Sequence, residues 1–348
     1  MARVLDACGG AAVSCLGRGT GTPRSHAIHA QVDRLAYAHT SFYLAARRSA
    51  RRHARARRAG WPRPRLLRQR RIRSNETALK MARHFVEIGQ GGRRRFIARR
   101  HSYHGNTLGA LAVGGNEDGR RLRTVADASA CSMYRGMRSG ETPDAMGSWW
   151  RNSTKRSWPP GQSVLAFVAE TVGGATTGAT TAPPCYFAGV REVCNRARVL
   201  LILDEVMCGM GRTGTLHACE QEGVIPDLHG HRQGWAAATS PLAPCSCTGG
   251  SWRRCRQAAV SSSMATPIWA IPSRARAALA VQEVIERDGL RRTSGSVASF
   301  AAIRMAARSA PPIPTWATCG PRALLGGGTA TARRRSRFPR PPDSPGSA

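Results

Sequence analysis

Lysine is almost absent from this sequence, although the chain is strongly basic. Its 348 residues include 53 lysines and arginines against 20 acidic residues, which gives a formal net charge of +33, and only Lys80 and Lys155 are lysines. An excess of arginine together with alanine, glycine and proline is also what GC-rich DNA yields when it is translated out of frame, because the codons CGN, GCN, GGN and CCN dominate. The composition therefore allows two interpretations, a basic binding surface or out-of-frame peptide.

Cysteine patterns that bind metals are also missing. The 11 cysteines include no Cys-x-x-Cys pair and no zinc-type spacing, and Cys245 and Cys247 stand too close together for the usual metal knuckle. We therefore predict no metal site and interpret the cysteines as reduced or incidental, in a cytoplasmic protein. A basic segment followed by an apolar one is absent, and so is an apolar run long enough to span a bilayer. No membrane partner is expected.

Acidic residues are missing from one stretch, residues 47–73, which contains thirteen arginines and a single aromatic residue, Trp61. Taken literally, such a stretch is a disordered or nucleic-acid-binding arm. Proteins that bind single strands usually stack the bases on aromatic side chains, so this composition supports base stacking poorly. Nucleic-acid binding is therefore the alternative function, and a nucleic-acid partner is not our first expectation.

A short apolar run that ends in two acidic residues is the most informative feature of the chain. Residues 199–203 run directly into Asp204 and Glu205. A continuous apolar run predicts a strand that is buried on both faces, and the carboxyl end of such a strand is where open α/β sheets bind ligands. Three glycines follow between residues 209 and 214 and let the backbone approach a ligand closely. The alternative is a core strand that ends in a solvated acidic turn.

The run LILDEVMCGMGRTG at residues 201–214 resembles the cofactor strand of class III pyridoxal-phosphate-dependent aminotransferases. In that family the aspartate of Asp-Glu-Val pairs with the protonated pyridine nitrogen of the cofactor, and Asp204 matches it. An ionised carboxylate there keeps the ring cationic, so that the ring can act as an electron sink. Val206 matches the residue that packs under the ring. Met207 stands where the family usually has a glutamine near the ring hydroxyl.

Two segments before this strand strengthen the resemblance. NETALKMARHFVEIG, residues 75–89, predicts an amphipathic helix that Asn75 caps and Gly89 ends. HSYHGNT, residues 101–107, follows a predicted strand at 95–100 and resembles the aromatic-His-Gly motif of the family. The resemblance implies that Tyr103 lies on the cofactor ring with His104 and Gly105 beside it. By itself, a Tyr-His-Gly triplet is more commonly an ordinary loop.

A second buried strand precedes the cofactor strand. VLAFVAETVGGATTG, residues 164–178, ends its apolar part at Glu170 and resembles the Val-Glu-Pro segment of the family, whose glutamate lies by the cofactor. Thr171 replaces the usual proline, and a merely solvated glutamate is the alternative interpretation. Residues 186–197 predict a helix between the two strands. This order predicts a right-handed βαβ unit and a parallel sheet.

The resemblance implies an α/β protein of the type I pyridoxal-phosphate-dependent transferase fold. Such a fold has a large domain with a mostly parallel sheet and a smaller domain built from both chain ends. The predicted segments are, in chain order, a small-domain segment at 1–44, an out-of-frame arginine-rich stretch at 45–74, the cofactor-binding large domain at 75–228 with a partly disrupted part at 119–163, an out-of-frame stretch at 229–278, a remnant helix region at 279–310 and a disordered tail at 311–348.

The lysine that the family needs is missing. It holds pyridoxal 5'-phosphate as a Schiff base and then moves a proton between substrate and cofactor. Its expected position lies near Gln233, but no lysine follows Lys155. We therefore assign no catalytic residue, and we expect Tyr103, His104, Gly105, Glu170, Asp204 and Val206 to form a cofactor site without its covalent anchor.

Shifted reading frames offer an explanation for the missing motifs. Residues 229–234, HGHRQG, have codons that can read T-A-I-A-K-G after a one-base shift. Residues 60–74 can likewise read G-L-D-H-V-Y-F-V-S-G-G-S-E-A, which restores the phosphate-binding turn of the family. Residues 235–244 and 264–272 can be shifted to further family motifs. We therefore interpret the chain as the translation of an aminotransferase gene with several frameshifts.

The expected function is transfer of an amino group between a small-molecule amino donor and an oxo acid, in a homodimer. Without the lysine, the chain is expected to be inactive as written. The alternative is a basic nucleic-acid-binding protein that uses the arginine runs, and a third interpretation is a lysine-less relative with a binding role. The arginine runs coincide with the places where the family motifs vanish, which favours the first interpretation.

Overall fold

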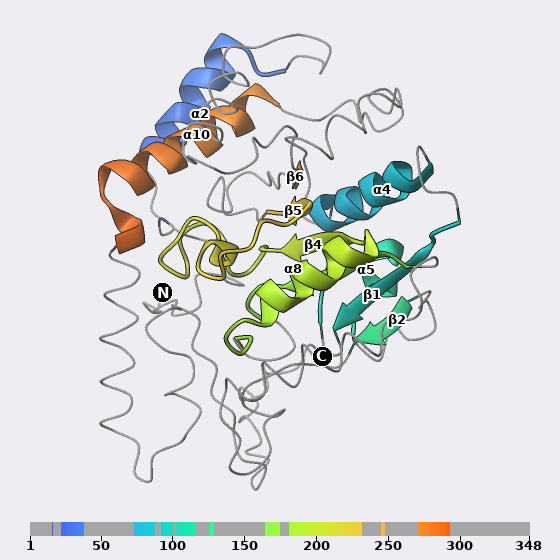
Figure 1. Cartoon of the computed structure of the whole chain (residues 1–348). Coiled ribbons are helices and arrows are strands. Elements are labelled where there is room, and N and C mark those ends of the chain that lie inside the picture. The colour runs from blue at the N-terminus through green and yellow to red at the C-terminus, as the bar shows by residue number, and fades with distance from the viewer. Residues whose placement is uncertain are drawn as a thin grey trace, which may run out of the picture.

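A six-stranded sheet is the centre of the computed structural model, which describes residues 16, 22–37, 73–87, 92–99, 102–115, 125–128, 164–174, 181–231, 245–247 and 271–292. The strands lie in the order β2-β1-β3-β4-β5-β6 (Figure 1). Their bounds are β1 Arg95–Arg99, β2 Val125–Ala128, β3 Val164–Glu170, β4 Leu200–Asp204, β5 Leu228–Gly230 and β6 Cys245–Cys247. Every neighbouring pair is parallel except β5 and β6, so the predicted mostly parallel sheet is confirmed.

The two central strands are buried along their whole length. All seven residues of β3 and all five of β4 are buried, as the continuous apolar runs predicted. The register pairs Glu170 with Asp204 at the carboxyl ends of these strands. Two acidic residues from separate sequence motifs therefore lie side by side at one edge of the sheet.

Helices cover both faces of the sheet. Successive strand residues point to opposite faces, so Ile202 of β4 packs with Leu79 of α4 (Arg73–Glu87), whereas Leu203 packs with Val190 of α8 (Tyr186–Ala197). The short helix α5 (Leu108–Ala112) lies beside α4. Helix α8 has the bounds that the sequence predicted and connects the parallel strands β3 and β4, which confirms the βαβ unit.

The start of α4 differs from the prediction. The helix begins at Arg73 and not after a capping Asn75, so Asn75 lies in the first turn. Its side chain donates to Asp204 and to the carbonyl oxygen of His104 instead of capping the helix. These two bonds to a buried carboxylate and a buried carbonyl replace the weaker local cap. Gly89, the predicted stop, lies outside the described residues.

Two helices from opposite ends of the chain pack on each other. Helix α2 (Pro23–Arg34) and helix α10 (Pro272–Arg287) lie side by side and apart from the sheet (Figure 1). Their shared apolar cluster includes Ile28, Ala278 and Val281. This arrangement agrees with a smaller domain built from both chain ends. None of the helices in the described ranges is both long and apolar enough to cross a membrane.

Helix α10 begins earlier than predicted. The sequence predicted a helix from residue 279, whereas α10 starts with Pro272. Proline suits the first helical position because its backbone angle is already helical and it has no N–H to satisfy there. The first seven residues of α10, strand β6 and two of the three residues of β5 fall within the stretch 229–278 that we interpret as out of frame. The domain boundaries themselves stay a prediction, and most of 45–74 and all of 311–348 lie outside the described residues.

Candidate active site

The carboxylate of Asp204 is the centre of the site. It ends β4 and is only 3% exposed. Its Oδ2 accepts hydrogen bonds from Asn75 Nδ2 at 2.6 Å and from His104 Nδ1 at 2.8 Å, and its Oδ1 accepts the backbone N–H of Val206 at 2.9 Å. These donors come from α4, from the turn after β1 and from the loop after β4. Together they hold the carboxylate in one orientation at the edge where open α/β sheets bind ligands.

Asn75 connects three parts of the chain around Asp204. Besides its bond to the carboxylate, Nδ2 donates to the carbonyl oxygen of His104 at 2.8 Å. Strand β5 passes so close that a β-carbon on Gly230 would collide with Asn75 Oδ1. A side chain at residue 230 would therefore force the Asn75 side chain to shift. The predicted site residues Asp204 and His104 are thus joined by a residue whose role the sequence did not reveal.

The turn after β1 brings the predicted aromatic motif to this edge of the sheet. Tyr103 is 41% exposed, while its neighbour His104 is buried. Gly105 has a φ of +128°, a conformation that L side chains rarely adopt. The backbone N–H of Tyr103 donates to Glu170 Oε2 at 3.3 Å, which fixes the turn to the end of β3. The exposed ring of Tyr103 is therefore available to stack on a ligand.

Glu170 is buried beside Asp204. Only 4% of the residue is exposed, which excludes the alternative of a solvated strand end. Its Oε1 accepts the backbone N–H of Gly174 at 3.1 Å, and the Arg99 guanidinium donates to its carbonyl oxygen. Burial raises the pKa of Glu170 above its ordinary value; His104 opposes this rise and the Asp204 carboxylate adds to it. The site therefore holds two neighbouring carboxyl groups in different environments.

Glu205, the second acid of the Asp-Glu pair, accepts hydrogen bonds from a different set of donors. Glu205 is fully buried and accepts hydrogen bonds from Thr171 Oγ1 at 3.0 Å and from the backbone N–H groups of Ala218 and Cys219, both at 2.7 Å. Burial acts to raise the pKa of Glu205, but the nearby His229 imidazole and the two backbone N–H donors outweigh it, so the pKa lies below its ordinary value. Thr171, which replaces the family's proline, thus gains a structural role.

Two residues of the loop after β4 were assigned from the resemblance. Val206 is half-buried, and its packing under a cofactor ring stays a prediction. Met207 packs against the loop after β3, where a β-carbon on Gly174 would lie 2.7 Å from Met207 Cγ. Met207 therefore brings a thioether to the place where the family usually has an amide.

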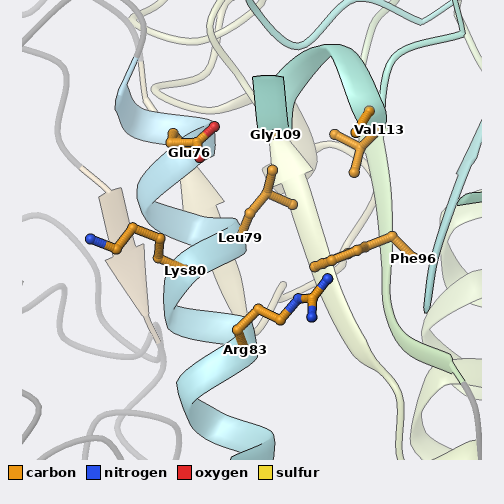
Figure 2. A pocket seen from close by; sticks show the side chains of 8 residues that line it. Glu76, Leu79, Lys80, Arg83, Phe96, Gly109 and Val113 are labelled. Carbon is orange, nitrogen blue, oxygen red and sulfur yellow. The ribbon is translucent and has the colours of Figure 1, made fainter. Parts of the chain in front are cut away.

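The lysine of α4 lines a separate cavity. Lys80 is the only lysine among the described residues, and it lies on the exposed side of α4. Figure 2 shows it with Arg83, Leu79 and Phe96 around a cavity of about 260 Å³ between α4, α5 and β1. The complete lining is Glu76, Leu79, Lys80, Arg83, Phe96, Gly109, Ala112 and Val113. Because Asp204, His104 and Tyr103 are not among these residues, Lys80 does not replace the missing lysine.

The residues present fit one half of a pyridoxal phosphate site. A carboxylate has four lone-pair positions, and donors among the described residues use three of those of Asp204, which leaves one on Oδ1 for a ring N–H donor. Tyr103 adds an exposed aromatic ring at the same edge. The covalent half does not fit, because the chain has no lysine after Lys155. Ser74, just before the NETALK run, accepts the backbone N–H of His231 at 3.0 Å.

The sheet and the site together define a pyridoxal-phosphate-dependent transferase of fold type I. Solved structures agree on the fold. A transaminase from ancestral reconstruction has a TM-score of 0.79 and is 23% identical, with 86% of this chain and 68% of that chain covered. A PLP-bound amine transaminase from an uncultivated Pseudomonas species has a TM-score of 0.77 and is 28% identical, with 87% of this chain and 70% of that chain covered.

The chain belongs to the class III aminotransferases, whose family model matches residues 2–309. An uncharacterized aminotransferase of Schizosaccharomyces pombe is 34% identical over 309 residues, which are 83% of this chain and 65% of the relative. An aminotransferase of Gibberella zeae is 43% identical over 180 residues, which are 48% of this chain and 35% of the relative. The chain thus spans about one to two thirds of the length of these relatives. The family uses pyridoxal 5'-phosphate, which confirms the expected cofactor at the family level.

The structure brings the predicted residues Tyr103, His104, Gly105, Glu170 and Asp204 to one edge of the sheet, with Val206 next to it. Their roles toward a cofactor stay predictions. The sequence did not reveal the partners Asn75 and Thr171, nor a group of buried histidines beside Glu205. No local pattern announces such contacts, because the partners are separated by 34 to 129 residues in the chain.

Proposed function

We propose that this chain is an aminotransferase polypeptide that keeps the ring-nitrogen half of its cofactor site and lacks the lysine that would hold the cofactor covalently. The observation that supports this proposal is the buried Asp204 carboxylate, oriented by Asn75, His104 and the Val206 N–H, with one lone pair of Oδ1 that no described residue uses. Bound pyridoxal phosphate supplies an electron-accepting ring for transamination. Asp204 would accept the N–H of this ring, and Tyr103 would cover one of its faces.

The expected consequence is weak, non-covalent cofactor binding without transamination. In the family reaction an amino donor and an oxo acid exchange their amino group, and a lysine amine carries the proton between the reacting atoms. Among the described residues no side chain offers such an amine near Asp204, since Lys80 lies on the exposed side of α4 and its side chain points away from Leu79, Arg83 and Phe96 (Figure 2). Which amino donor and oxo acid the parent enzyme takes depends on loops that the frameshift interpretation places out of frame.

Binding and attachment can be measured separately. Pyridoxamine 5'-phosphate has no aldehyde and cannot react with amines, so its equilibrium dialysis reports the non-covalent site alone. We expect saturable binding that Asp204→Asn weakens by about tenfold or more, because a buried charge-assisted bond is lost. Asp33→Asn, an exposed residue of α2, is the matched control and should bind as the unchanged chain does.

The proposal fails if Asp204→Asn and the unchanged chain bind equally. It also fails if added pyridoxal phosphate leaves a coloured adduct that survives gel filtration, together with turnover of an amino donor and an oxo acid. Mass spectrometry after borohydride reduction then identifies the amine that carries the cofactor.

We propose further that the missing lysine results from frameshifts in the coding DNA. The arginine-rich stretch 47–73 and the region near Gln233 are the places where the family's phosphate turn and lysine motif vanish, and both can be read in shifted frames as those motifs. Sequencing the coding DNA across codons 45–75 and 228–280 tests this. Stop codons in the shifted frames, or codons that cannot encode these motifs, would exclude the interpretation.

Family membership also supports a homodimer and a cytoplasmic location for the parent enzyme. Sedimentation velocity of the purified chain tests the first, with a dimer expected over a monomer. Cell fractionation tests the second. A monomer, or a location outside the cytoplasm, would contradict the respective expectation without contradicting the cofactor site near Asp204.

The alternative function is nucleic-acid binding, and the net charge of +33 is the observation that favours it. A phosphate-binding surface of this charge would lose affinity steeply as the salt concentration rises. This alternative would be supported if a folded, monodisperse chain bound DNA and if the dependence of its affinity on salt concentration corresponded to the release of several counterions. DNA binding that appears only when the chain is aggregated would indicate non-specific charge attraction.

A further inference from the structure

Three buried histidines gather beside Glu205, outside the site around Asp204. His217 precedes the short 3-10 helix η2 (Ala218–Glu220), His229 lies in β5, and His231 follows β5 directly. The centroids of their rings are 4.2 to 4.6 Å apart in all three pairs. Residues at i and i+2 of a strand point to the same side, which is why His229 and His231 converge. Each of the three residues is at most 5% exposed.

A nitrogen atom of His217 and one of His229 lie near the buried carboxylate of Glu205. His229 Nε2 lies 3.8 Å from Glu205 Oε1, and His217 Nδ1 lies 4.0 Å from Glu205 Oε2. Both distances are too long for a hydrogen bond. His229 Nε2 is buried and has no hydrogen-bond partner among the described residues. A buried nitrogen without a partner costs free energy, so this arrangement points to a group that is bound between the side chains.

The spacing suits a metal ion. Each of the three histidines offers a ligand nitrogen, and these nitrogens lie within 4.8 Å of one another. Zinc binds imidazole nitrogen at about 2.0–2.1 Å and carboxylate oxygen at about 2.0–2.2 Å, so two ligands of one ion are separated by at most about 4 Å. The gaps of 3.8 and 4.0 Å between these two histidines and Glu205 lie within this limit, whereas the three histidine nitrogens, which lie within 4.8 Å of one another, would have to move closer together to bind one ion.

The donor set selects the kind of ion. Three imidazole nitrogens favour zinc and its neighbours among the transition metals, whereas magnesium and calcium prefer oxygen ligands. Glu205 adds negative charge, and its Oε2 accepts only one hydrogen bond among the described residues, from the Ala218 N–H. That oxygen keeps a free lone pair for a cation.

We propose that His217, His229 and His231 bind a divalent transition-metal ion such as Zn²⁺, with Glu205 as the neighbouring carboxylate. Such an ion would tie β5 and the turn before η2 to the end of β4. Because the backbone N–H of His231 donates to Ser74 Oγ at 3.0 Å, it would also fix β5 to the first turn of α4. The site belongs to this polypeptide and does not depend on cofactor binding. It was hidden from the sequence because His217 stands apart from His229 and His231 and no zinc-type spacing connects them.

The test uses the full-length chain without a histidine tag, after removal of metals with a chelator. Titration with Zn²⁺ by calorimetry should give one site per chain, and Co²⁺ should give the visible absorbance of a low-symmetry nitrogen and oxygen site. His229→Gln and His231→Gln should each weaken binding at least about tenfold. His29→Gln on the exposed side of α2 is the matched control and should leave the affinity unchanged. Circular dichroism without metal shows whether each variant is folded.

A second measurement needs no variant. X-ray absorption of the zinc-loaded chain should show nitrogen and oxygen neighbours at about 2.0–2.1 Å, with the multiple-scattering pattern of imidazoles. The competing ligand group is Glu205, Cys219 and His229, and a sulfur neighbour at about 2.3 Å would overturn the three-histidine site in its favour. Retained binding in Cys219→Ala supports the proposal. Equal affinity in the unchanged chain and in the triple histidine variant excludes it.

Discussion

Glu205 shows at the scale of single residues how a buried charge is held. Its carboxylate is fully buried and accepts three hydrogen bonds, two of them from backbone N–H groups. These bonds exist only in the folded chain, and with His229 they keep the pKa of Glu205 below its ordinary value despite burial, which acts to raise it. A group with a lowered folded pKa contributes stability above its unfolded pKa, near 4.3, and this contribution is lost as the pH falls through the folded pKa.

Replacement of Glu205 by glutamine should therefore destabilise the chain in a pH-dependent way. At pH 7 we expect a loss of about 3 kcal/mol in the free energy of unfolding. The NH2 group of glutamine would face a backbone N–H that needs an acceptor, and the charge-assisted hydrogen bonds of the carboxylate would be lost. The loss should shrink below about pH 4. Denaturant unfolding with a chelator present measures both. Glu192→Gln on the exposed side of α8 is the control, and its loss should stay within about 0.5 kcal/mol. A pH-independent difference would contradict the assignment.

Asn75 offers a second test at the same scale. Asn75→Ala removes the two hydrogen bonds that Nδ2 donates to Asp204 and to the His104 carbonyl. We expect a loss of about 2 kcal/mol, since one of these bonds goes to a buried carboxylate. The matched control is Asn195→Ala on the exposed side of α8, which should change the free energy of unfolding by less than about 0.5 kcal/mol. Equal effects of the two substitutions would show that the hydrogen bonds of Asn75 add nothing to the free energy of unfolding.

Gly230 tests whether the crowding around Asn75 is real. A β-carbon there would collide with Asn75 Oδ1, so Gly230→Ala should cost about 1–3 kcal/mol. In the Asn75→Ala background the obstacle is gone, and the cost of Gly230→Ala should fall below about 1 kcal/mol. A double-mutant cycle by denaturant unfolding measures the coupling. Additive losses would mean that another contact limits residue 230.

The candidate site was only partly predictable from the sequence. Asp204 and Glu170 could be placed because each ends an apolar run, and the ends of parallel strands meet at one edge of a sheet. Asn75 was predicted as a helix cap because its local surroundings fit one, but a contact with Asp204 across 129 residues decided its role. The histidines beside Glu205 were missed for the same reason, since only the folded chain brings β5 and the turn before η2 together.

At the scale of helices and strands, the prediction worked where burial gives a simple pattern. Strands β3 and β4 and helix α8 were predicted closely, because buried strands are continuous apolar runs and a crossover helix must connect them. The start of α4 was predicted a few residues too late and that of α10 seven residues too late, since helix ends depend on caps and tertiary contacts that the apolar pattern does not carry. Strand β6 was missed, as a three-residue strand shows no periodicity.

The contact between α2 and α10 gives a prediction at this scale. Val281 of α10 is completely buried in the cluster that Ile28 of α2 joins, whereas Val32 of α2 is 45% exposed. Val281→Ala should cost about 2 kcal/mol through lost burial and a small cavity. Val32→Ala should be neutral or gain up to about 0.5 kcal/mol, because alanine is the better helix former. Thermal unfolding compares the pair, and equal effects would show that the two helices do not share a packed core.

At the scale of the whole molecule, two properties of the chain disagree. Its fold and its match over residues 2–309 place it among the class III aminotransferases. Its net charge is +33, and no lysine follows Lys155, although the family resemblance implies a Schiff-base lysine near Gln233. A large charge of one sign also destabilises a compact state by self-repulsion. The frameshift interpretation removes the disagreement, because it explains the arginine excess and the missing lysine by one cause.

A chain with restored reading frames provides the last prediction. Replacing residues 60–74, 229–244 and 264–272 by the shifted translations would exchange six arginines of the first segment for a peptide with two acidic residues, and would introduce the Ala-Lys-Gly motif. The lysine amine can then add to the aldehyde of pyridoxal phosphate, so we expect a coloured chain that keeps its cofactor through gel filtration and turns over an amino donor. Borohydride reduction should trap the cofactor on that lysine.

The matched control carries the same replacements with the new lysine changed to alanine. It should fold like the restored chain and bind DNA equally weakly, but should hold no cofactor after gel filtration. This comparison separates the loss of the lysine from the loss of the fold, since both restored chains regain the phosphate turn. If the restored chain stays colourless while its lysine-free control folds equally well, the shifted frames are not the origin of the missing motifs, and the arginine-rich segments need an explanation of their own.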